Sequence, residues 1–372
     1  MHPQQRFPFV STARAATITS AAFILACAGM PRASGRAAND AVAATQARHF
    51  IDSLRRTQSI PGMAATVFRG DREIWSEGFG LADVDGRIPA TPVTLFRVGS
   101  VTKLLTAVSL MRLVDRGVVQ LDAPVNTYLD GLPTHWSGVT LRQLAGHTAG
   151  VRHYRGAEFF SRAEYPTLRA ALGIFVDDSL LFPAGTRYGY SSYGYNLIGA
   201  VLEAVTSQPF PRTLKQLVLD PLRLSKTLPD SAGKSIPDRS TLYRVTSSGV
   251  SATPADNLSS RWPSGGYLST TRDLARFGSA AHRPGLLSDS ARRIMVAPQR
   301  LPSGDSTRVG IGWRVGTDAA GRRYYHHGGT SNGGAAFLIV YPREQLVVAM
   351  ASNAFAAWSE PEAVRVAALF LH

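Results

Sequence analysis

Strand-like patterns occur near both ends of this 372-residue chain and are scarce between them. Near the N-terminus, residues 64–68 and 73–79 are patterned as strands, and Arg69-Gly70-Asp71 between them signals a turn, which predicts a hairpin. Residues 120–264 contain helical pieces separated by loops rich in proline and glycine. Towards the C-terminus, four further strands are expected at residues 309–315, 323–327, 335–341 and 346–352.

This arrangement predicts an α+β domain in which both ends of the chain build one sheet part. The sheet part would combine residues 45–120 with residues 262–372, and residues 121–261 would form an inserted, mainly helical part. Apolar residues on several sides of the helix expected at 101–116 indicate that this helix is central and buried, with Gly117 ending it. Further helices are expected at residues 39–57 and 360–371.

Composition places the chain among globular proteins, because 44% of its residues are hydrophobic and 18% are charged. Basic residues outnumber acidic residues by 40 to 26, and nearly all of the positive charge is arginine. No arginine cluster is interleaved with aromatic residues, so a nucleic-acid partner is not expected. We interpret the arginines as a soluble surface that would also suit an anionic cell-wall environment.

The N-terminus has the pattern of a leader. Residues 15–30 form an uncharged apolar run behind Arg6 and Arg14, and the run is shorter than the ~20 residues that span a bilayer. This pattern predicts a secretory signal peptide over residues 1–28 and a linker over 29–44. The segment Ile-Leu-Ala-Cys also resembles a bacterial lipobox, in which case the signal is 1–26 and Cys27 is lipidated. We expect a secreted or periplasmic protein that meets a membrane only through a lipid on Cys27.

Ser100 and Lys103 have the spacing of a nucleophile and its base. If Ser100 opens a helix, Lys103 lies one turn on, on the same face. A serine hydroxyl needs an adjacent base, and a lysine amine kept neutral by burial can provide one. The alternative is a helix-capping serine with a solvated lysine. Ser231 and Lys234 have the same spacing in a proline-flanked loop, which we interpret as chance.

Tyr190 and a histidine pair are the other candidates for chemistry. Tyr190 precedes an expected helix and could relay a proton in a cleft, although packing is the alternative in such a tyrosine-rich stretch. Strand alternation sends His326 and His327 to opposite faces, so only one of them can face a given site. The sequence leaves open which one does. A metal site is not expected, and we interpret the loop histidines His135, His147 and His153 as structural or solvated.

A series of motifs in one order carries a family resemblance. They are PGMAATVFRGD, TLFRVGSVTKLLTA, LDAPVNTYL, TLRQLAGHTAG, FPAGTRYGYSSYGYNLIGAVLE, SGGYLSTTRDLARFG and HHGG, and they fall between residues 60 and 353. With them the sequence resembles the serine β-lactamase-like superfamily, in the branch of class C β-lactamases, D-Ala-D-Ala carboxypeptidases and related esterases. The resemblance implies a β-lactamase/transpeptidase-like fold: an antiparallel sheet flanked by helices, with an inserted mainly helical region.

The resemblance also implies a role for each candidate residue. Ser100 would be the acylated nucleophile, Lys103 its base, and Tyr190 the tyrosine of the family's Tyr-x-Asn motif, relaying protons. His326 would open a His-x-Gly segment in the place of the Lys-Thr-Gly of many β-lactamases. The backbone N–H groups of Ser100 and Gly329 would form the oxyanion hole. No metal or organic cofactor is implied.

Two departures from the family pattern bear on the substrate. Ser192 stands where the family often has asparagine, which removes an amide that can hold a substrate carbonyl. His326, followed by His327 and Gly328 in the substrate-binding segment, stands where a lysine often helps to bind a substrate carboxylate. Both departures favour a carboxypeptidase-like or esterase-like enzyme over an efficient β-lactamase.

The expected function is that of a secreted serine hydrolase that forms an acyl-enzyme at Ser100. The bond cleaved would be an amide or an ester, in a D-amino-acid peptide, a small acyl ester or a β-lactam, and a cell-wall peptide is one candidate partner. The alternative is a catalytically weak or inactive penicillin-binding or scaffold protein that retains the fold. The sequence leaves the acyl group and the leaving group open, because the loops that line a pocket decide them.

Overall fold

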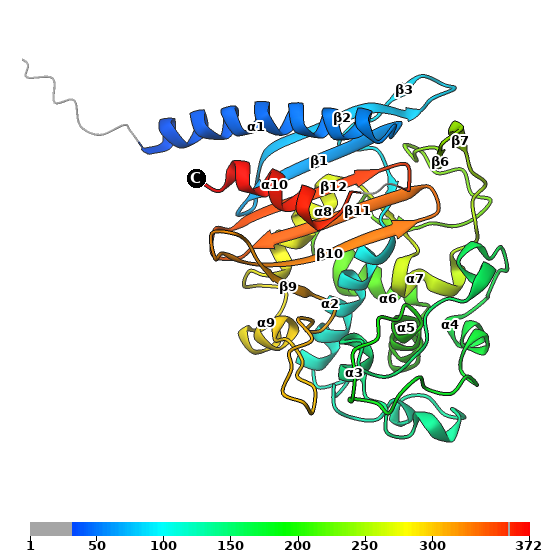
Figure 1. Cartoon of the computed structure of the whole chain (residues 1–372). Coiled ribbons are helices and arrows are strands. Elements are labelled where there is room, and N and C mark those ends of the chain that lie inside the picture. The colour runs from blue at the N-terminus through cyan, green and yellow to red at the C-terminus, as the bar shows by residue number, and fades with distance from the viewer. Residues whose placement is uncertain (1–31, 356–357) are drawn as a thin grey trace, which may run out of the picture. The chain divides into compact units, whose positions relative to one another are not determined.

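The computed structural model describes residues 32–355 and 358–372 (Figure 1). The chain divides into two units, residues 1–38 and 39–372. The predicted signal peptide and Cys27 lie outside the described residues. Helix α1 spans Arg32–Thr57 and begins well before residue 39, so residues 32–44 are helical rather than the expected linker.

A seven-stranded sheet brings the two ends of the chain together, in the order β3-β2-β1-β12-β11-β10-β9. Every pair of neighbours in it is antiparallel, and β1 pairs with β12 from Met63 opposite Ser352 to Arg69 opposite Leu346. The expected antiparallel sheet built from both chain ends is therefore confirmed. The strands are β1 (Gly62–Arg69), β2 (Arg72–Asp83), β3 (Ile88–Pro89), β9 (Arg314–Thr317), β10 (Arg323–Ser331), β11 (Gly334–Tyr341) and β12 (Leu346–Ser352).

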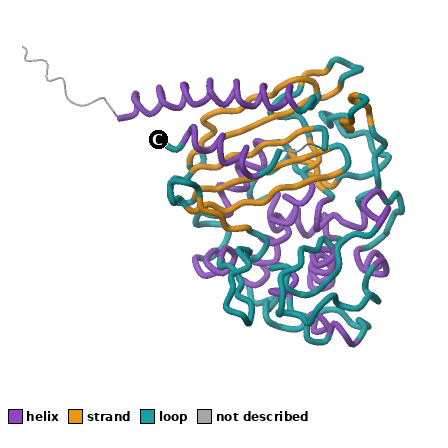
Figure 2. The backbone as a smooth tube through the Cα atoms, viewed as in Figure 1, coloured by secondary structure: helices purple, strands orange, loops and turns teal. Residues whose placement is uncertain are grey.

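Both faces of this sheet are buried, as strand β11 shows most clearly. Its residues alternate between two hydrophobic clusters, as a period of two requires. Ala336, Leu338 and Val340 enter the cluster that contains helix α8 (Thr271–Ala281). Phe337 and Ile339 enter the other, which contains α10 (Glu360–Phe370) and residues of α1 after position 38. The sheet is thus covered by helices on both sides (Figure 2).

Helix α2 (Thr102–Asp115) is the centre of the helical part and is buried along most of its length. It packs against α5 (Tyr193–Thr206), α7 (Trp262–Gly265) and α9 (Asp289–Val296). Of these partners, α7 and α9 come from residues 262–372, which the sequence had grouped with residues 45–120. The shorter helices here are α3 (Leu141–Ala145), α4 (Leu168–Ala171) and α6 (Phe210–Leu214).

Small strands lie among these helices, although the sequence between residues 120 and 264 gave little strand pattern. β4 (Phe96–Arg97), β8 (Tyr267–Ser269) and β5 (Leu228–Pro229) form a three-stranded sheet. β6 (Tyr243–Thr246) and β7 (Gly249–Ala252) form a separate hairpin. All four residues of β7 are exposed, so no apolar alternation marks this strand in the sequence.

Most other predicted elements are confirmed, with one clear exception. The hairpin and the strand at 346–352 are present, and Gly117, at a φ of 70°, follows α2 as expected. The strand expected at 309–315 is wrong, because β9 begins only at Arg314. Gly312 explains the error: it has a φ of 80°, and a Cβ added to it would lie 2.9 Å from Ala107 of α2.

The turn that carries Ser100 presses directly against β10. Residues Gly99–Val101 form a short 3-10 turn that leads into α2. Gly99 has a φ of 49°, and a Cβ added there would lie 2.5 Å from the carbonyl oxygen of Thr330. A Cβ added to Gly329 would lie 2.0 Å from the carbonyl oxygen of Val98. Glycine on both sides therefore allows Ser100 to reach the edge of the sheet.

Arg97, just before this turn, forms a fully buried ion network. Its side chain is 1% exposed, and Nε donates to Asp230 Oδ2 at 2.5 Å. Nη1 pairs with Asp256 and donates to the carbonyl of Asn332 at 3.1 Å. Arg261 pairs with the second oxygen of Asp256. The network fixes the strand before Ser100 to residues of the helical part and to the β10–β11 turn.

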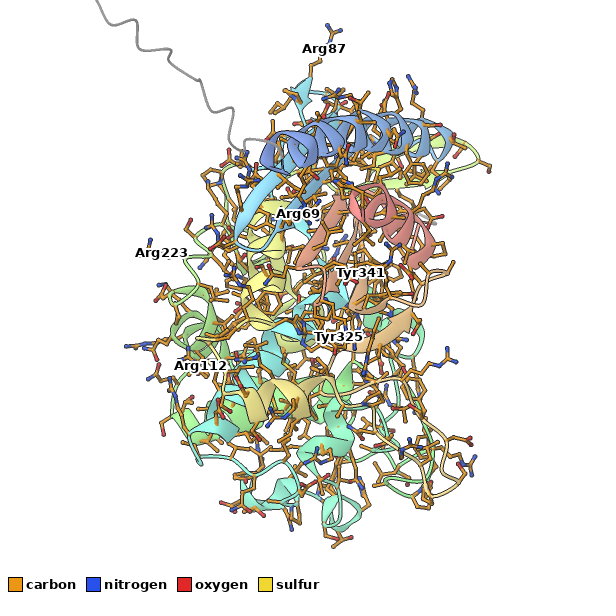
Figure 3. All side chains as sticks on the ribbon, turned by 90° about the vertical axis from the view of Figure 1, so that its left-hand side faces the viewer. Arg69, Arg87, Arg112, Arg223, Tyr325 and Tyr341 are labelled. Atoms are coloured by element: carbon orange, nitrogen blue, oxygen red, sulfur yellow. The ribbon has the colours of Figure 1, made fainter. Side chains whose placement is uncertain are left out.

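Many of the other arginines lie on the surface, as the charge pattern predicted. Figure 3 shows Arg87 and Arg223 extending outward, and both are exposed. Among the described residues, none of the helices has the length and apolar character needed to cross a bilayer.

We predict that Arg97→Met destabilises the protein strongly, because it leaves Asp230 and Asp256 buried with fewer partners. Removal of one member of a buried ion pair costs about 3–5 kcal/mol. The matched control is Arg48→Met, since Arg48 pairs with Glu77 while its side chain is 50% exposed, and an exposed pair contributes less than about 1 kcal/mol. Urea unfolding of both variants measures the difference. Equal free energies of unfolding would contradict the structural role of the network.

Candidate active site

Ser100, Lys103 and Tyr190 meet although they come from three different segments. Ser100 lies in the 3-10 turn, Lys103 in the first turn of α2, and Tyr190 in the loop before α5. The Lys103 Nζ lies 3.1 Å from Ser100 Oγ, and the Tyr190 hydroxyl donates to the same oxygen at 2.9 Å. The three residues expected to carry chemistry are therefore brought together around one oxygen atom.

The Lys103 amine is enclosed by uncharged partners. Besides Ser100 Oγ, its Nζ contacts Ser192 Oγ at 3.0 Å and the Ser264 carbonyl oxygen at 2.7 Å. The pKa of Lys103 is lowered to about 7, mainly by burial; Tyr154 opposes this shift, and the nearby positive charge of Arg314 adds to it. A large fraction of Lys103 is thus neutral near pH 7. Because the Ser264 carbonyl only accepts, a neutral amine can offer its lone pair to the Ser100 hydroxyl.

Tyr190 is held as a neutral phenol. Burial raises its pKa, and the hydrogen bond with Ser100 and the charge of Arg314 offset only part of that rise. The phenol therefore keeps its proton at neutral pH and acts as a donor to Ser100 Oγ. Its ring packs against His147, with ring centroids 4.4 Å apart, and against His153 at 5.4 Å.

His147 and His153 hold the segment that carries Tyr190 and Ser192. The backbone N–H of Ser191 donates to Nδ1 of His147 at 3.3 Å, and that of Ser192 donates to Nδ1 of His153 at 3.3 Å. Burial lowers the pKa of both histidines, for His153 to about 4, so both rings are neutral. The backbone N–H groups that point at Nδ1 assign the remaining ring proton to Nε2. A structural role, which is one of the two interpretations that the sequence allowed, fits both His147 and His153. The sequence did not reveal that these side chains support the loop that carries Tyr190.

Ser192 lies beside the Lys103 amine. Its side chain is buried, it lines the pocket described below, and its hydroxyl is hydrogen-bonded to Lys103. The loop histidine His135 lies elsewhere, against the carbonyl of Val176. Within the described part of the chain there is no group of three or more His, Cys, Asp or Glu side chains that could hold a metal.

The two histidines of β10 face different neighbours. The His327 ring lies 6.2 Å from the Tyr190 ring, and its Nδ1 is 2.5 Å from the Gly328 carbonyl oxygen. His326 instead stacks on Phe337 and places Nε2 3.6 Å from a carboxylate oxygen of Glu360 in α10. Both histidines line the pocket, and the side chain near Tyr190 is that of His327. The sequence had left open which of the two faces the site.

Gly328 and Gly329 complete the edge of the strand beside Ser100. A Cβ added to Gly329 would lie 2.7 Å from the Ser100 backbone nitrogen, and one added to Gly328 would lie 3.0 Å from the Phe337 ring. The backbone groups expected to bind an oxyanion are therefore next to each other. Both glycines and Ser100 line the same pocket.

The pocket over these groups has a volume of about 500 Å³ and contains two arginines that the sequence analysis did not single out. Arg261 is held by Asp256 of the buried network. Arg314 lies over the Tyr190 ring at 5.6 Å and donates to the Tyr188 hydroxyl at 3.3 Å. Nothing in the sequence distinguishes Arg314 among the many arginines. Ser264, in contrast, opens one of the motifs that carried the family resemblance.

Comparisons with known proteins identify the family of the chain. The family model described as Beta-lactamase matches residues 47–372. The chain is 25% identical over 321 residues to the human serine beta-lactamase-like protein LACTB, mitochondrial, and the match covers 67% of this chain and 58% of that protein. The chain thus spans less than two thirds of the length of this relative.

Two solved structures are similar in fold. One is the octameric penicillin-binding protein homologue from Pyrococcus abyssi, with a TM-score of 0.78, 23% identity and coverage of 88% of this chain and 77% of that one. The other is a D-stereospecific amidohydrolase from Streptomyces sp., with a TM-score of 0.75, 24% identity and coverage of 87% and 98%. The expected fold class is confirmed, and the chain belongs to the beta-lactamase family, a family of serine hydrolases that share this fold.

Proposed function

We propose that this protein hydrolyses an amide or ester bond through an acyl-enzyme on Ser100. The observation that carries the proposal is the position of Ser100 Oγ, which lies 3.1 Å from a lysine amine and 2.9 Å from a tyrosine hydroxyl. The amine has a pKa of about 7, so it can accept a proton at neutral pH. A nucleophile, a base and an acid are thus in contact before any substrate arrives.

In the proposed acylation step, neutral Lys103 takes the Ser100 proton as Oγ attacks the carbonyl carbon of the substrate. The backbone N–H groups of Ser100 and Gly329 bind the oxyanion that develops. Tyr190 then gives its proton to the leaving group. Ser192 is hydrogen-bonded to the Lys103 amine and to Tyr190, so its hydroxyl offers a path by which the lysine proton returns to the phenol.

Deacylation uses the same groups in reverse, with water in the place of the leaving group. The water loses its proton to the base and attacks the acyl carbon, and Ser100 leaves with its proton restored. Three active groups assembled around one oxygen support an enzyme over an inactive binding or scaffold protein, because a scaffold needs no buried neutral amine.

The substrate we favour is a D-amino-acid peptide or a small acyl ester rather than a β-lactam. Ser192 offers one short hydroxyl, which is already bonded to Lys103, where an asparagine would offer a donor and an acceptor. Arg261 and Arg314 make the pocket positive and could receive an anionic group. The Streptomyces protein with a similar fold is described as a D-stereospecific amidohydrolase, which makes D-amino-acid amides reasonable test substrates.

We also propose that the protein acts outside the cytoplasm, on the basis of the signal-peptide pattern of residues 1–28.

We predict that Ser100→Ala abolishes both labelling by a fluorescent phosphonate and turnover of p-nitrophenyl acetate, because the nucleophile is removed. The fold should persist, since the Ser100 side chain makes no capping bond. Ser231→Ala is the matched control, because Ser231 has the same spacing to a lysine, and it should behave as the parent. If Ser100→Ala were still labelled and active, the proposed site would be wrong.

We predict that acylation of Ser100 accelerates as the pH rises through about 7 and levels off above it. The neutral amine is the base, and its fraction grows as pH passes the Lys103 pKa of about 7. The measurement is the second-order rate constant for phosphonate labelling across this range. Lys103→Arg should be nearly inactive throughout, because a guanidinium stays protonated. An inflection at the ordinary lysine value of 10.5 would show that Lys103 is not the buried base.

We predict that Ser192→Asn raises acylation by a penicillin more than it raises hydrolysis of a nitrophenyl ester. The longer amide can hold the substrate carbonyl, and one hydrogen bond contributes on the order of 1 kcal/mol, so the ratio of rates should shift several-fold. Both rates are measured on the parent and the variant, with thermal melting to confirm folding. An unchanged ratio would mean that residue 192 does not touch the substrate.

A further inference from the structure

We propose that the site accepts substrates with a linear apolar acyl chain, which binds in a second pocket that adjoins the first. This inference rests on the proposed Ser100 acyl-enzyme and names the acyl group that it carries. We call the second pocket the apolar annex, and its volume is about 350 Å³. Its lining includes Phe159, Phe160, Arg244, Asn332, Gly333 and Phe355.

The annex continues the active-site pocket beyond the end of strand β10, at the turn that follows Ser331. Residues 326–331 line the active-site pocket, and the next two residues, Asn332 and Gly333, line the annex. Phe159 lines both pockets. A strand advances about 3.3 Å per residue, so the path from Gly329, beside Ser100, to Gly333 is at most ~13 Å long. The annex begins nearer than Gly333, because Phe159 lines both pockets, so a medium-length acyl chain on Ser100 would enter it at Phe159.

The direction of the annex matches the acyl half of a substrate rather than its leaving group. Tyr190, the proposed donor to the leaving group, has its ring 6.2 Å from His327, which precedes Gly329 in β10. Asn332 and Gly333 follow Gly329 in the chain, so the annex lies towards the other end of the strand. The leaving group and the acyl chain would therefore extend in opposite directions from Ser100.

Two exposed phenylalanines make the annex unusual. Phe160 is 50% exposed and Phe355 is 57% exposed, and no other phenylalanine in the described part of the chain is among its exposed large hydrophobic residues. Phe160 packs edge-on against Phe159, with ring centroids 5.1 Å apart. Covering large apolar side chains that are exposed to water lowers the free energy, so such side chains favour the binding of an apolar ligand. Both phenylalanines are thus placed to be covered by an apolar chain.

The charge of the annex also fits a neutral chain. Arg244 is its one charged lining residue, and no carboxylate lines it. Arg244 is exposed, so its guanidinium can remain in water while its stem contributes apolar surface. A charged peptide end would lose its hydration against the phenylalanine rings, which costs free energy, whereas a hydrocarbon chain has no such hydration to lose.

The test is a series of p-nitrophenyl esters from acetate through butyrate to octanoate, used below their micelle concentrations. For the parent, kcat/KM should rise roughly two- to four-fold for each methylene that the annex buries. Phe160→Ala and Phe355→Ala should each lower the octanoate-to-acetate ratio of kcat/KM by about ten-fold, since part of the apolar wall is lost. Ile88→Ala is the matched control, because Ile88 is 54% exposed on strand β3 and lines neither pocket. It should leave the ratio at the parent value.

The outcomes separate this inference from the proposed function. If the parent turns over acetate but its rate does not depend on chain length, or the phenylalanine variants keep the parent ratio, the annex does not bind the acyl chain. If no ester acylates Ser100 in the parent, the proposed function itself fails. The other candidate occupant of the annex is a second copy of this chain, and size-exclusion chromatography of the same proteins tests for it. If the parent self-associates, the phenylalanine variants do not, and their octanoate-to-acetate ratio of kcat/KM equals that of the parent, the two phenylalanines form a contact between copies and the inference is overturned.

Discussion

Burial of the Lys103 amine without a carboxylate partner is the constraint on which the site depends. The amine touches two serine hydroxyls and one carbonyl oxygen, and burial brings its pKa to about 7. Enclosing it requires α2 to be packed among helices on most sides, and the 3-10 turn before α2 to pack against β10. The mainly helical part of the protein is thus the enclosure that lowers the pKa of this lysine and so suits it to the role of base that we propose.

Arg97 is a second buried basic residue nearby, and unlike Lys103 it is buried together with carboxylate partners. Arg97 is as deeply buried as Lys103, but it is paired with Asp230 and Asp256 and keeps its charge. An arginine cannot lose its proton in a protein, so its burial demands carboxylates, whereas a lysine can lose its proton instead. Arg97 and Lys103 are six residues apart in the chain. Arg97 therefore holds the backbone before Ser100 in place, and Lys103 is available for the proton transfer that we propose.

The pocket combines two kinds of surface that suit the two halves of a substrate. Near Tyr190, Arg314 provides positive charge beside the proposed path of the leaving group. Along β10 in the other direction, Phe159 leads to the apolar annex with Phe160 and Phe355. Strand β10 connects both regions, because the same strand passes Ser100 midway. Specificity would then come from loops around a fixed strand, as loop-borne specificity usually does.

The sequence by itself determined the elements and the groups that depend on local spacing. Lys103 follows Ser100 by three residues, so any helix starting there brings them together, and the apolar patterns at the two chain ends identified most strands of the sheet. Only the tertiary structure decided which histidine of β10 lies near Tyr190, and that Arg314 joins the pocket. Those choices depend on the face that a strand presents and on contacts between segments far apart in the chain, which local patterns do not encode.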